Sequence, residues 1–507
     1  MTTDVLICGA GPTGLVLALQ LARAGVRVRV VDAAAEPGTT SRALVVHART
    51  LEIYRQMGLA DAFLDEGVKF EAVNLWVRRR RVAHVELGAI GKGLTPFPHL
   101  IVCAQDRHER FLAAQLERAG VRIERASELI DFEQTSDRVR ARLRTPAGDQ
   151  TCEAAFLAGC DGAHSRVREV IGVGFPGGTY SHVFYVADVD ATGPMMNSEL
   201  HVALDDADFM AVFPLKGGTT ARLIGTVEAE DERAREALTW DDVGRRTALR
   251  LRIEVSRVNW FSTYRVHHRV ASRFRDRRVF LLGDAAHVHS PAGAQGMNTG
   301  IGDAANLGWK LADVVHGRAR ATLLDSYEPE RIAFARRLVA TTDRAFVIAT
   351  SEGRLARFVR LRIVPRVLPA LLRFAAVRRF VFRTVSQTAV SYRGGPLSAG
   401  RQGAVHGGDR LPWVEDNFAV VDGRAWRVHV YGNAGPGVEE ACRSLGLPLH
   451  VFAWRPVMGK AGLVRDALYL VRPDGYIALA DPGTSPAALV RYVEALFGRP
   501  SDRPTPA

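Results

Sequence analysis

The N-terminal part of the chain alternates between apolar runs and a glycine-rich break. Val5–Cys8 form a continuous apolar run, and the glycine-rich segment Gly9–Gly14 follows it at once. The next residues are apolar at helical spacing, and a second apolar run, Val26–Val31, ends at Asp32. This pattern predicts a strand, a tight turn, a helix and a parallel second strand that ends in an acid.

The spacing of the glycines in the turn, Gly-x-Gly-x-x-Gly, points to a dinucleotide. The first glycine permits the tight turn, the second lets a pyrophosphate approach the helix N-terminus, and the third allows close packing of helix on strand. The acid about 20 residues further on can accept hydrogen bonds from ribose hydroxyls. The predicted cofactor-binding residues of this unit are Gly9, Gly11, Pro12, Thr13, Gly14 and Asp32.

A second match to the same glycine spacing occurs at Gly172, Gly174 and Gly177. It follows a helical pattern, contains Pro176, and leads into a strand pattern rather than a helix. Because no helix follows to receive a phosphate, we expect a loop there. The sequence therefore predicts one dinucleotide site.

Two further apolar runs end in an acid followed by a turn. The run before Asp161 leads into a helix whose first turn Ser165 can cap, a pattern that a plain strand-turn-helix corner also explains. The run before Asp284 leads into a Gly- and Ala-rich loop and then a helix from about Thr299 to Val315. A buried, ionised acid at a strand end needs a polar partner, which a ligand would supply.

The middle of the chain changes to the alternation that is typical of strands. Between residues 179 and 272 we expect a sheet, with a hairpin over Gly217 and Gly218. Near the C-terminus, further strands are predicted near Trp426–Val430, Leu449–Phe452, Ala467–Val471 and Tyr476–Leu479.

Composition adds the protein class and the compartment. The 507 residues, 47% of them hydrophobic, fit a soluble globular protein of about two to four domains. A strand pattern begins almost at the first residue, which leaves no leader peptide, and we expect the cytoplasm. Five scattered cysteines suit free buried thiols, and no metal-ligand spacing is present.

The formal net charge of +12 could attract nucleic acid, a membrane surface or small anions. Arg78–Arg81 predict a polar hairpin turn, and nine arginines from Arg354 to Arg383 are interleaved with Leu, Val and Phe and with Pro365 and Pro369. We favour a docked helical connector with a solvated basic face over an interfacial amphipathic segment. No recognition-helix or aromatic-basic pattern accompanies it, so we expect neither nucleic acid nor stable membrane insertion.

The glycine turn and the two elements that begin at Asp161 and Gly283, taken together, resemble a known family. The glycine turn, the DGxxSxVR element at Asp161–Arg168 and the GDAAH…GMNxGxxDAxNLxWKLA element from Gly283 occur in the order found in the group A flavoprotein monooxygenases. These are aromatic-ring hydroxylases that act on phenol, para-hydroxybenzoate and aromatic polyketides. The resemblance covers roughly residues 1–345 and includes "SRALVVHARTLEIYRQMGL" and "LLDSYEPERIAFARRLV".

The resemblance implies FAD and assigns residues to it. Asp284 would bond the ribityl chain, and the loop Pro291–Asn298 would direct backbone N–H groups at the isoalloxazine ring. Ser290 and Ala294 depart from the family's usual proline and glycine. The residues implied to contact the cofactors are Arg42, Gln105, Asp161 (flavin and nicotinamide), Gly283, Asp284, Pro291, Gly296, Met297 and Asn298.

The implied reaction uses NADPH or NADH to reduce FAD, forms a C4a-hydroperoxide with oxygen, and hydroxylates a phenolic or polyketide-type ring. Alternatives are a Baeyer-Villiger oxygenase or a halogenase, the latter disfavoured because no W-x-W-x-I-P stretch is present, and a non-catalytic, FAD-holding peripheral membrane protein. Candidate catalytic residues are Arg42, Pro291, Tyr264 and His267, and candidate substrate contacts are His201, Met210 and Phe213.

The expected fold class is α/β, with a Rossmann-like FAD domain interleaved with a mainly β substrate domain. Residues 1–75, 101–178 and 273–395 would form the FAD domain with its helical connector, and residues 76–100 and 179–272 the substrate hairpin and sheet. Residues 396–507 resemble the thioredoxin-like extension of phenol and polyketide hydroxylases. Without a C-x-x-C pair that domain is expected to support the structure or form a homodimer.

Overall fold

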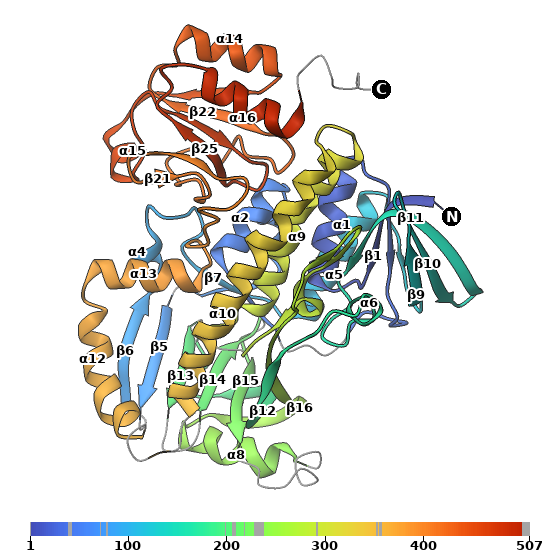
Figure 1. The fold of residues 1–507 in the computed structure, drawn as a ribbon. Helices are drawn as coiled ribbons and strands as arrows, with labels where there is room; N and C mark the ends of the chain where they lie inside the picture. The colour runs from blue at the N-terminus through green and yellow to red at the C-terminus, as the bar shows by residue number, and fades with distance from the viewer. Residues whose placement is uncertain are drawn as a thin grey trace.

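The computed structural model describes residues 2–38, 43–70, 72–77, 80–197, 199–204, 209–216, 218–227, 238–290, 293–350, 353 and 357–498. Arg42 and Pro291, two candidate site residues, lie outside these ranges. Figure 1 shows a central α/β body, a β-sheet below it and a C-terminal α/β region above it. All five cysteines are free thiols, as expected.

A largely parallel sheet forms the centre of the body. Strand β1 (Thr2–Cys8) lies between β2 (Val28–Val31) and β11 (Gly148–Gly159) and runs parallel to both. Beyond β11 lies β18 (Val279–Leu281), also parallel. Because parallel strands end at the same edge, this order brings the three acid-ended turns together. The sheet is completed by β8 (Ile123–Glu124), β9 (Glu128–Gln134), β10 (Val139–Thr145) and β17 (Arg275–Asp276).

Helix α1 (Pro12–Arg23) packs between α9 (Gly296–Val315) and α5 (Gln105–Arg118). Their apolar faces and the central strands form the main hydrophobic core. The predicted strand, turn, helix and strand are confirmed, and the second glycine match is a loop before β12, as expected. The remaining elements of the body are α2 (Ala48–Gln56), α3 (Ala60–Leu64), α6 (Arg166–Val170), β3 (Val45–Val46), β4 (Val68–Phe70) and β7 (Leu100–Val102).

The second sheet has the order β19-β16-β12-β15-β14-β13-β5-β6. Its β14–β15 pair confirms the predicted hairpin. One face packs on the central α/β body and the other is covered by α8 (Trp240–Arg250). The strands are β5 (Ala72–Val77), β6 (Arg80–Glu86), β12 (Gly177–Thr192), β13 (Leu200–Leu204), β14 (Phe209–Pro214), β15 (Thr220–Val227), β16 (Glu254–Val270) and β19 (His287–Val288).

The chain then leaves the body through helices. These are η2 (Ala321–Ser326), α10 (Tyr327–Thr350), η3 (Val359–Ile363), α12 (Val364–Leu371) and α13 (Ala375–Val385). The short turn η1 (Gly283–Ala285) stays in the body, directly after β18. The predicted helical connector is confirmed, although α12 contains no buried residue, so its apolar side chains are less docked than expected. Within the ranges given above, no helix is both long and apolar enough to cross a membrane.

The C-terminal region is a mixed sheet in the order β21-β20-β25-β24-β22-β23, with strands where the sequence predicted them. Its likeness to thioredoxin and its role in a homodimer stay predictions. Its elements are β20 (Ala399–Gln402), β21 (Val405–His406), β22 (Arg427–Tyr431), α14 (Pro436–Leu445), β23 (Leu449–Phe452), α15 (Pro456–Lys460), β24 (Leu468–Val471), β25 (Ile477–Asp481) and α16 (Ala487–Phe497). The short helix α4 (Leu87–Gly91), which follows β6, packs on α13.

Buried ion pairs join this region to the body. Arg472, fully buried, donates to Glu330 on α10 at 2.6 and 3.0 Å, and Lys310 on α9 donates to the same carboxylate at 2.8 Å. Burial alone would raise the pKa of Glu330, but the two cations lower it to about 2. Leaving one of these buried charges unpaired would cost free energy, so the ion pairs fix how the C-terminal region packs on the body.

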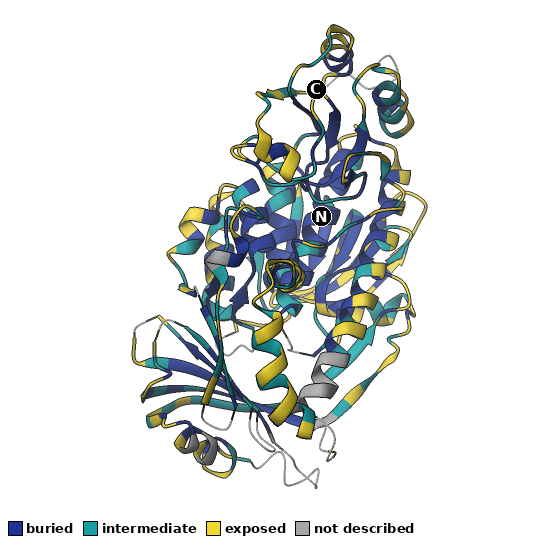
Figure 2. Cartoon of the chain, turned by 90° about the vertical axis from the view of Figure 1, so that its left-hand side faces the viewer, coloured by how far each residue is buried: buried dark blue, intermediate teal, exposed yellow. Residues whose placement is uncertain are grey.

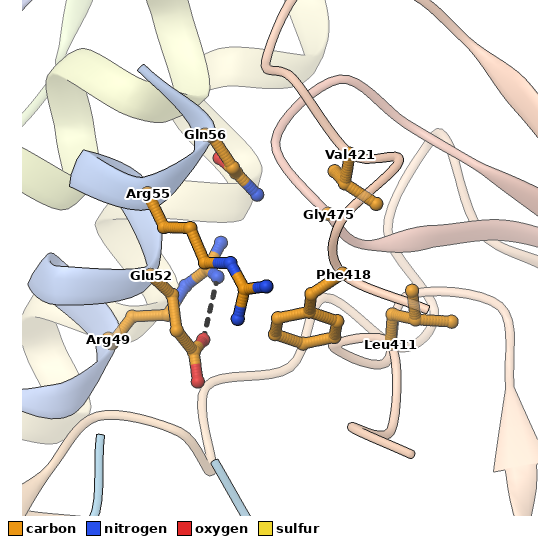
Figure 3. Close-up of a pocket in the computed structure, with 8 residues that line it drawn as sticks. All are labelled: Arg49, Glu52, Arg55, Gln56, Leu411, Phe418, Val421 and Gly475. Atoms are coloured by element: carbon orange, nitrogen blue, oxygen red, sulfur yellow. Dashed lines mark hydrogen bonds and ion pairs between the residues drawn. The ribbon is translucent and has the colours of Figure 1, made fainter. Parts of the chain in front are cut away.

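A second buried contact lies at α2. Arg410 pairs with Glu52, which also accepts from Arg49 at 3.1 Å and from the Thr95 hydroxyl at 2.6 Å. Figure 3 shows Arg49 and Glu52 on α2 beside a crevice whose opposite wall carries Leu411 and Phe418. This crevice is a seam between the two regions, and the candidate flavin residues do not line it.

Candidate functional site

The first glycine turn is tightly enclosed on its inner side. Gly9 has φ +103°, and a Cβ there would lie 2.2 Å from the Cys160 carbonyl oxygen. A Cβ at Gly14 would lie 2.0 Å from the Gly9 carbonyl oxygen. Both positions therefore require glycine for steric reasons, and the turn is held against the end of β11.

The outer side of the turn is open. A Cβ at Gly11 would meet nothing within 4 Å. Gly11 is the N-cap of α1, makes no side-chain cap hydrogen bond, and is followed by Pro12 at the first helical position. No side chain caps the start of α1, and an uncapped helix N-terminus suits an anion such as a pyrophosphate.

Asp32 reaches back to the same turn. Its carboxylate accepts from the Ala10 N–H at 2.6 Å and from the Ala34 N–H at 2.9 Å, and Arg125 lies 3.6 Å away. A carboxylate has further lone pairs, so Asp32 can still accept from a ribose.

Two side chains that the sequence did not single out join Asp32. Arg125 lies in the segment after β8, and Glu109 on α5 accepts from Gln105 Nε2 at 2.7 Å. Burial raises the pKa of Glu109, with Arg125 and Asp32 among its charged neighbours. The predicted Gln105 therefore lies in a polar cluster at the end of β2. No motif marks Arg125, which only the pairing of β2 with β8 brings here.

Asp161 is used within its own turn. Its carboxylate accepts from the Ser165 hydroxyl at 2.6 Å and from the Val167 N–H at 3.0 Å, and Ser165 caps α6 as expected. Burial raises the pKa of Asp161. These bonds fit the plain corner that the sequence left open, and a contact with flavin or nicotinamide stays a prediction.

The third turn lies directly against the first. Gly283 has φ +59°, and a Cβ there would lie 2.7 Å from Thr13 Oγ1; a Cβ at Gly300 would lie 2.3 Å from the same oxygen. Thr13 of α1 therefore sits between the Gly283 turn and α9. Segments almost 300 residues apart in sequence form one edge.

The two acids near this turn differ in burial. Asp284 is exposed, whereas Asp303 on α9 is the buried carboxylate behind the turn. Asp303 accepts from the Gly283 N–H at 3.0 Å, His287 Nε2 at 2.7 Å and Arg331 Nε at 2.6 Å. Burial would raise the pKa of Asp303, but Arg331 and His287 keep it below its usual value. Asp303 thus fixes the turn, and Asp284 points outward.

The loop before α9 is fixed from the other side. Helix α9 begins at Gly296, earlier than predicted, so Gly296, Met297 and Asn298 belong to its first turn. Asn298 donates to the carbonyls of Val45 at 2.8 Å and Ala294 at 3.1 Å and accepts from the His47 N–H at 2.9 Å.

His47, which the sequence also missed, holds the same loop. Its Nε2 lies 2.9 Å from the Gly293 carbonyl oxygen and 3.2 Å from that of Ala294. Because carbonyls only accept, Nε2 carries the proton. Burial lowers the pKa of His47 to about 4, so this ring is neutral near pH 7. Ala294 has φ +52°, a left-handed conformation that costs a non-glycine residue about 1–2 kcal/mol.

An aromatic face lies opposite this loop. Phe213 and Tyr264 pack with Phe184, Val45 and Ala294 in one apolar cluster. The Phe184 and Tyr264 rings stack with centroids 5.6 Å apart. On the same face Arg222, a cross-strand neighbour of Phe213, pairs with Asp188 at 2.7 Å.

The other candidate residues of this sheet are not brought to that face. Met210 packs in the separate cluster with Tyr185 and Trp240 of α8. His201 accepts from Trp76 Nε1 at 3.0 Å and lies 2.7 Å from the Asn197 side-chain oxygen. Burial lowers the pKa of His201 to about 4.

His267 is also occupied elsewhere. Its Nδ1 lies 2.7 Å from the Thr179 hydroxyl, while Val266 beside it belongs to the aromatic face. Of the candidate substrate-side residues, the structure therefore brings together Phe213 and Tyr264.

Fold and site define a dinucleotide-binding protein in which an apolar sheet covers the nucleotide edge, and comparison with known proteins gives the family. Residues 2–342 match the family model "FAD binding domain". The chain is 34% identical to 6-methylpretetramide 4-monooxygenase from Streptomyces rimosus, over 98% of this chain and 94% of that protein. It is 31% identical to a rifampicin monooxygenase from Rhodococcus hoagii, over 98% of each chain.

Comparison with solved structures points to the same kind of protein. Anhydrotetracycline hydroxylase from Streptomyces rimosus superposes with a TM-score of 0.80 at 29% identity, covering 99% of this chain and 100% of that one. The chain belongs to the FAD-binding-domain family, among the flavin-dependent aromatic monooxygenases that its motifs resemble.

Proposed function

We infer that the protein uses NADPH or NADH, oxygen and FAD to hydroxylate an apolar, multi-ring phenolic or polyketide-type substrate. The observation that carries this proposal is the aromatic face of Phe213 and Tyr264, which lies across from the loop at Ala294. A face of this kind excludes water and holds flat aromatic rings. The relatives named for tetracycline-type compounds and rifampicin support a large substrate.

The residues present fit FAD. The open side of Gly11 and the uncapped start of α1 would hold the pyrophosphate, and Asp32 would hold the ribose. Asp284, exposed at the edge beside Thr13, would hold the ribityl chain. When bound, FAD supplies the redox chemistry, accepting hydride from the nicotinamide and activating oxygen.

The chain's own residues would position the flavin and the substrate and shield them from water. His47 and Asn298 fix the loop carbonyls, which keeps the first N–H groups of α9 in place beside the ring site. The Arg222–Asp188 pair offers a polar anchor at the rim of an otherwise apolar face, suited to a substrate oxygen. We also propose the cytoplasm as the location, because five free cysteines suit a reducing compartment.

The test is turnover with a panel of phenols and polycyclic aromatic compounds. The FAD-loaded protein should oxidise NADPH or NADH faster when a substrate is added and yield a product that is heavier by one oxygen atom. NMR of the product separates a new ring hydroxyl from the ester that a Baeyer-Villiger reaction gives. An ester product, or no stimulation by any compound, would contradict the proposal.

A matched pair of variants links the activity to the aromatic face. Phe213→Ala removes a ring from that face, whereas Met210→Ala removes a side chain of similar size from the opposite face of the same strand. The first should raise KM for the aromatic substrate, and the second should leave KM unchanged. Equal effects on KM would show that the face does not bind the substrate.

A further inference from the structure

A basic helical hairpin projects from the edge of the substrate sheet. We define it as residues 357–385, which contain η3, α12 and α13. Helix α12 packs against β6, and α13 packs against α4. Figure 2 shows both helices toward the viewer, coloured mostly as exposed and intermediate residues.

The exposed surface of the hairpin is apolar to an unusual degree. Ile363, Val367 and Leu371 are all exposed and follow one another at four-residue spacing, which places them on one face of the helix. Phe374, at the bend between α12 and α13, is 64% exposed, and Phe380 on α13 is 70% exposed. Large apolar side chains gathered in this way mark an interaction surface.

The same surface is strongly basic. Arg362 and Arg366 flank the apolar stripe, and Arg373 and Arg379 flank the two phenylalanines. No Asp or Glu occurs from Gly353 to Gly408. Within the described part of the chain these four arginines make no ion pair; Arg366 donates instead to the Arg362 carbonyl oxygen. The hairpin therefore carries positive charge that its own structure does not neutralise.

The positive charge of the hairpin determines what kind of partner can bind to it. In a symmetric dimer built on this surface, the same uncompensated arginines would face one another, which is repulsive. An anionic bilayer supplies both missing parts, since its headgroups neutralise arginines and its interface accepts phenylalanine and aliphatic side chains. We propose that the basic hairpin docks the enzyme onto the surface of a membrane rich in anionic phospholipid.

Docking in this way would bring the edge of the substrate sheet to the bilayer, where apolar aromatic compounds accumulate. The proposal rests on exposure and charge and not on turnover, so it can fail while the proposed function holds. It differs from insertion, because the hairpin lies on the interface.

The experiment is co-sedimentation of the FAD-loaded, full-length protein with vesicles. Vesicles of phosphatidylcholine alone are compared with vesicles made of equal parts of phosphatidylcholine and phosphatidylglycerol, each at low and at high salt. We expect binding only to the anionic vesicles and a marked loss at high salt, because exposed charges are screened.

Two double variants locate the surface. Arg373→Gln with Arg379→Gln should lower the partition coefficient about fivefold for each arginine, or about twenty-five-fold together. Phe374→Ser with Phe380→Ser should lower it about tenfold or more. Matched controls change exposed residues elsewhere, Arg118→Gln with Arg465→Gln and Val451→Ser with Val457→Ser, and should leave binding unchanged.

Flavin absorbance of each variant checks that the protein is folded. Equal binding to both vesicle types, no binding at low salt, or equal loss in the control variants would overturn the proposal. So would sedimentation velocity showing, without lipid, a dimer that the phenylalanine variant dissociates, because the hairpin would then join two copies of this chain.

Discussion

Replacing Gly11 by alanine separates the cofactor role of the glycine turn from its structural role. The backbone at Gly11 has φ −76° and ψ 179°, which alanine adopts without strain. A methyl group there meets no protein atom within 4 Å. The apoprotein should therefore be as stable as the wild type, or more stable by about 0.4–1 kcal/mol, because alanine restricts the unfolded chain.

FAD binding should respond in the opposite direction. The methyl group would occupy the open side of the turn, where the pyrophosphate approaches the first N–H groups of α1. Losing one hydrogen bond to a charged group costs about 1.5–3 kcal/mol, which weakens FAD affinity about ten- to a hundredfold. Titration of the apoprotein with FAD, followed by quenching of flavin fluorescence, measures this, and urea unfolding of the apoprotein measures stability.

Gly14→Ala is the matched control. Its Cβ would lie 2.0 Å from the Gly9 carbonyl oxygen, so the turn must move and the apoprotein should lose stability. If Gly11→Ala bound FAD with wild-type affinity, or unfolded as easily as Gly14→Ala, the pyrophosphate would not lie where the structure leaves room for it.

Further predictions concern the acids and the aromatic face. Asp284→Ala should yield folded protein depleted of flavin, and full yellow occupancy with normal turnover would contradict our placement. Asp303→Asn should lower the free energy of unfolding by about 3–5 kcal/mol in urea, because it leaves a buried arginine without its carboxylate; an unchanged midpoint would refute this. Glu330, with a folded pKa of about 2, contributes stability that is present above its unfolded pKa of 4.5 and lost as pH falls toward 2, so Glu330→Gln should flatten the acid limb of the stability curve. With Phe213→Ala, we expect KM to rise more than kcat falls, whereas Met210→Ala should change stability alone.

The glycine turn and the acid-ended strands could be predicted because their signals are local. Gly9, Gly14 and the residues that follow specify one strand-turn-helix unit within a short stretch, and the structure contains it. The meeting of that turn with Gly283 follows from parallel strand order, which the family resemblance supplied.

The substrate side could not be predicted as well, because it depends on sheet register. His201 and Met210 were chosen by residue type, yet alternation along β13 and β14 turns them toward α8, away from Phe213 and Tyr264. Bulges between β12 and β16 shift the register again before His267. A one-residue change of register moves every side chain to the other face, and no local pattern reveals it.

Which individual acids are buried could not be predicted from the sequence either. Asp284 and Asp303 lie in one motif, and their sequence neighbourhoods are alike in polarity. Only the packing of α10 on α9, which brings Arg331 to Asp303, makes one of them internal.

The charged contacts between the C-terminal region and the body bear on how far this enzyme can be shortened. Glu330, Lys310 and Glu52 belong to the body, but Arg472 and Arg410, which complete their pairing, come from the far end of the chain. Cutting the protein after the flavin motifs would remove one guanidinium partner from Glu330 and one from Glu52, and would leave Lys310 and Arg49 as their remaining cations. A shortened catalytic fragment would thus need a redesigned surface at this seam, and the C-terminal fifth of the polypeptide is required for the structure of the rest.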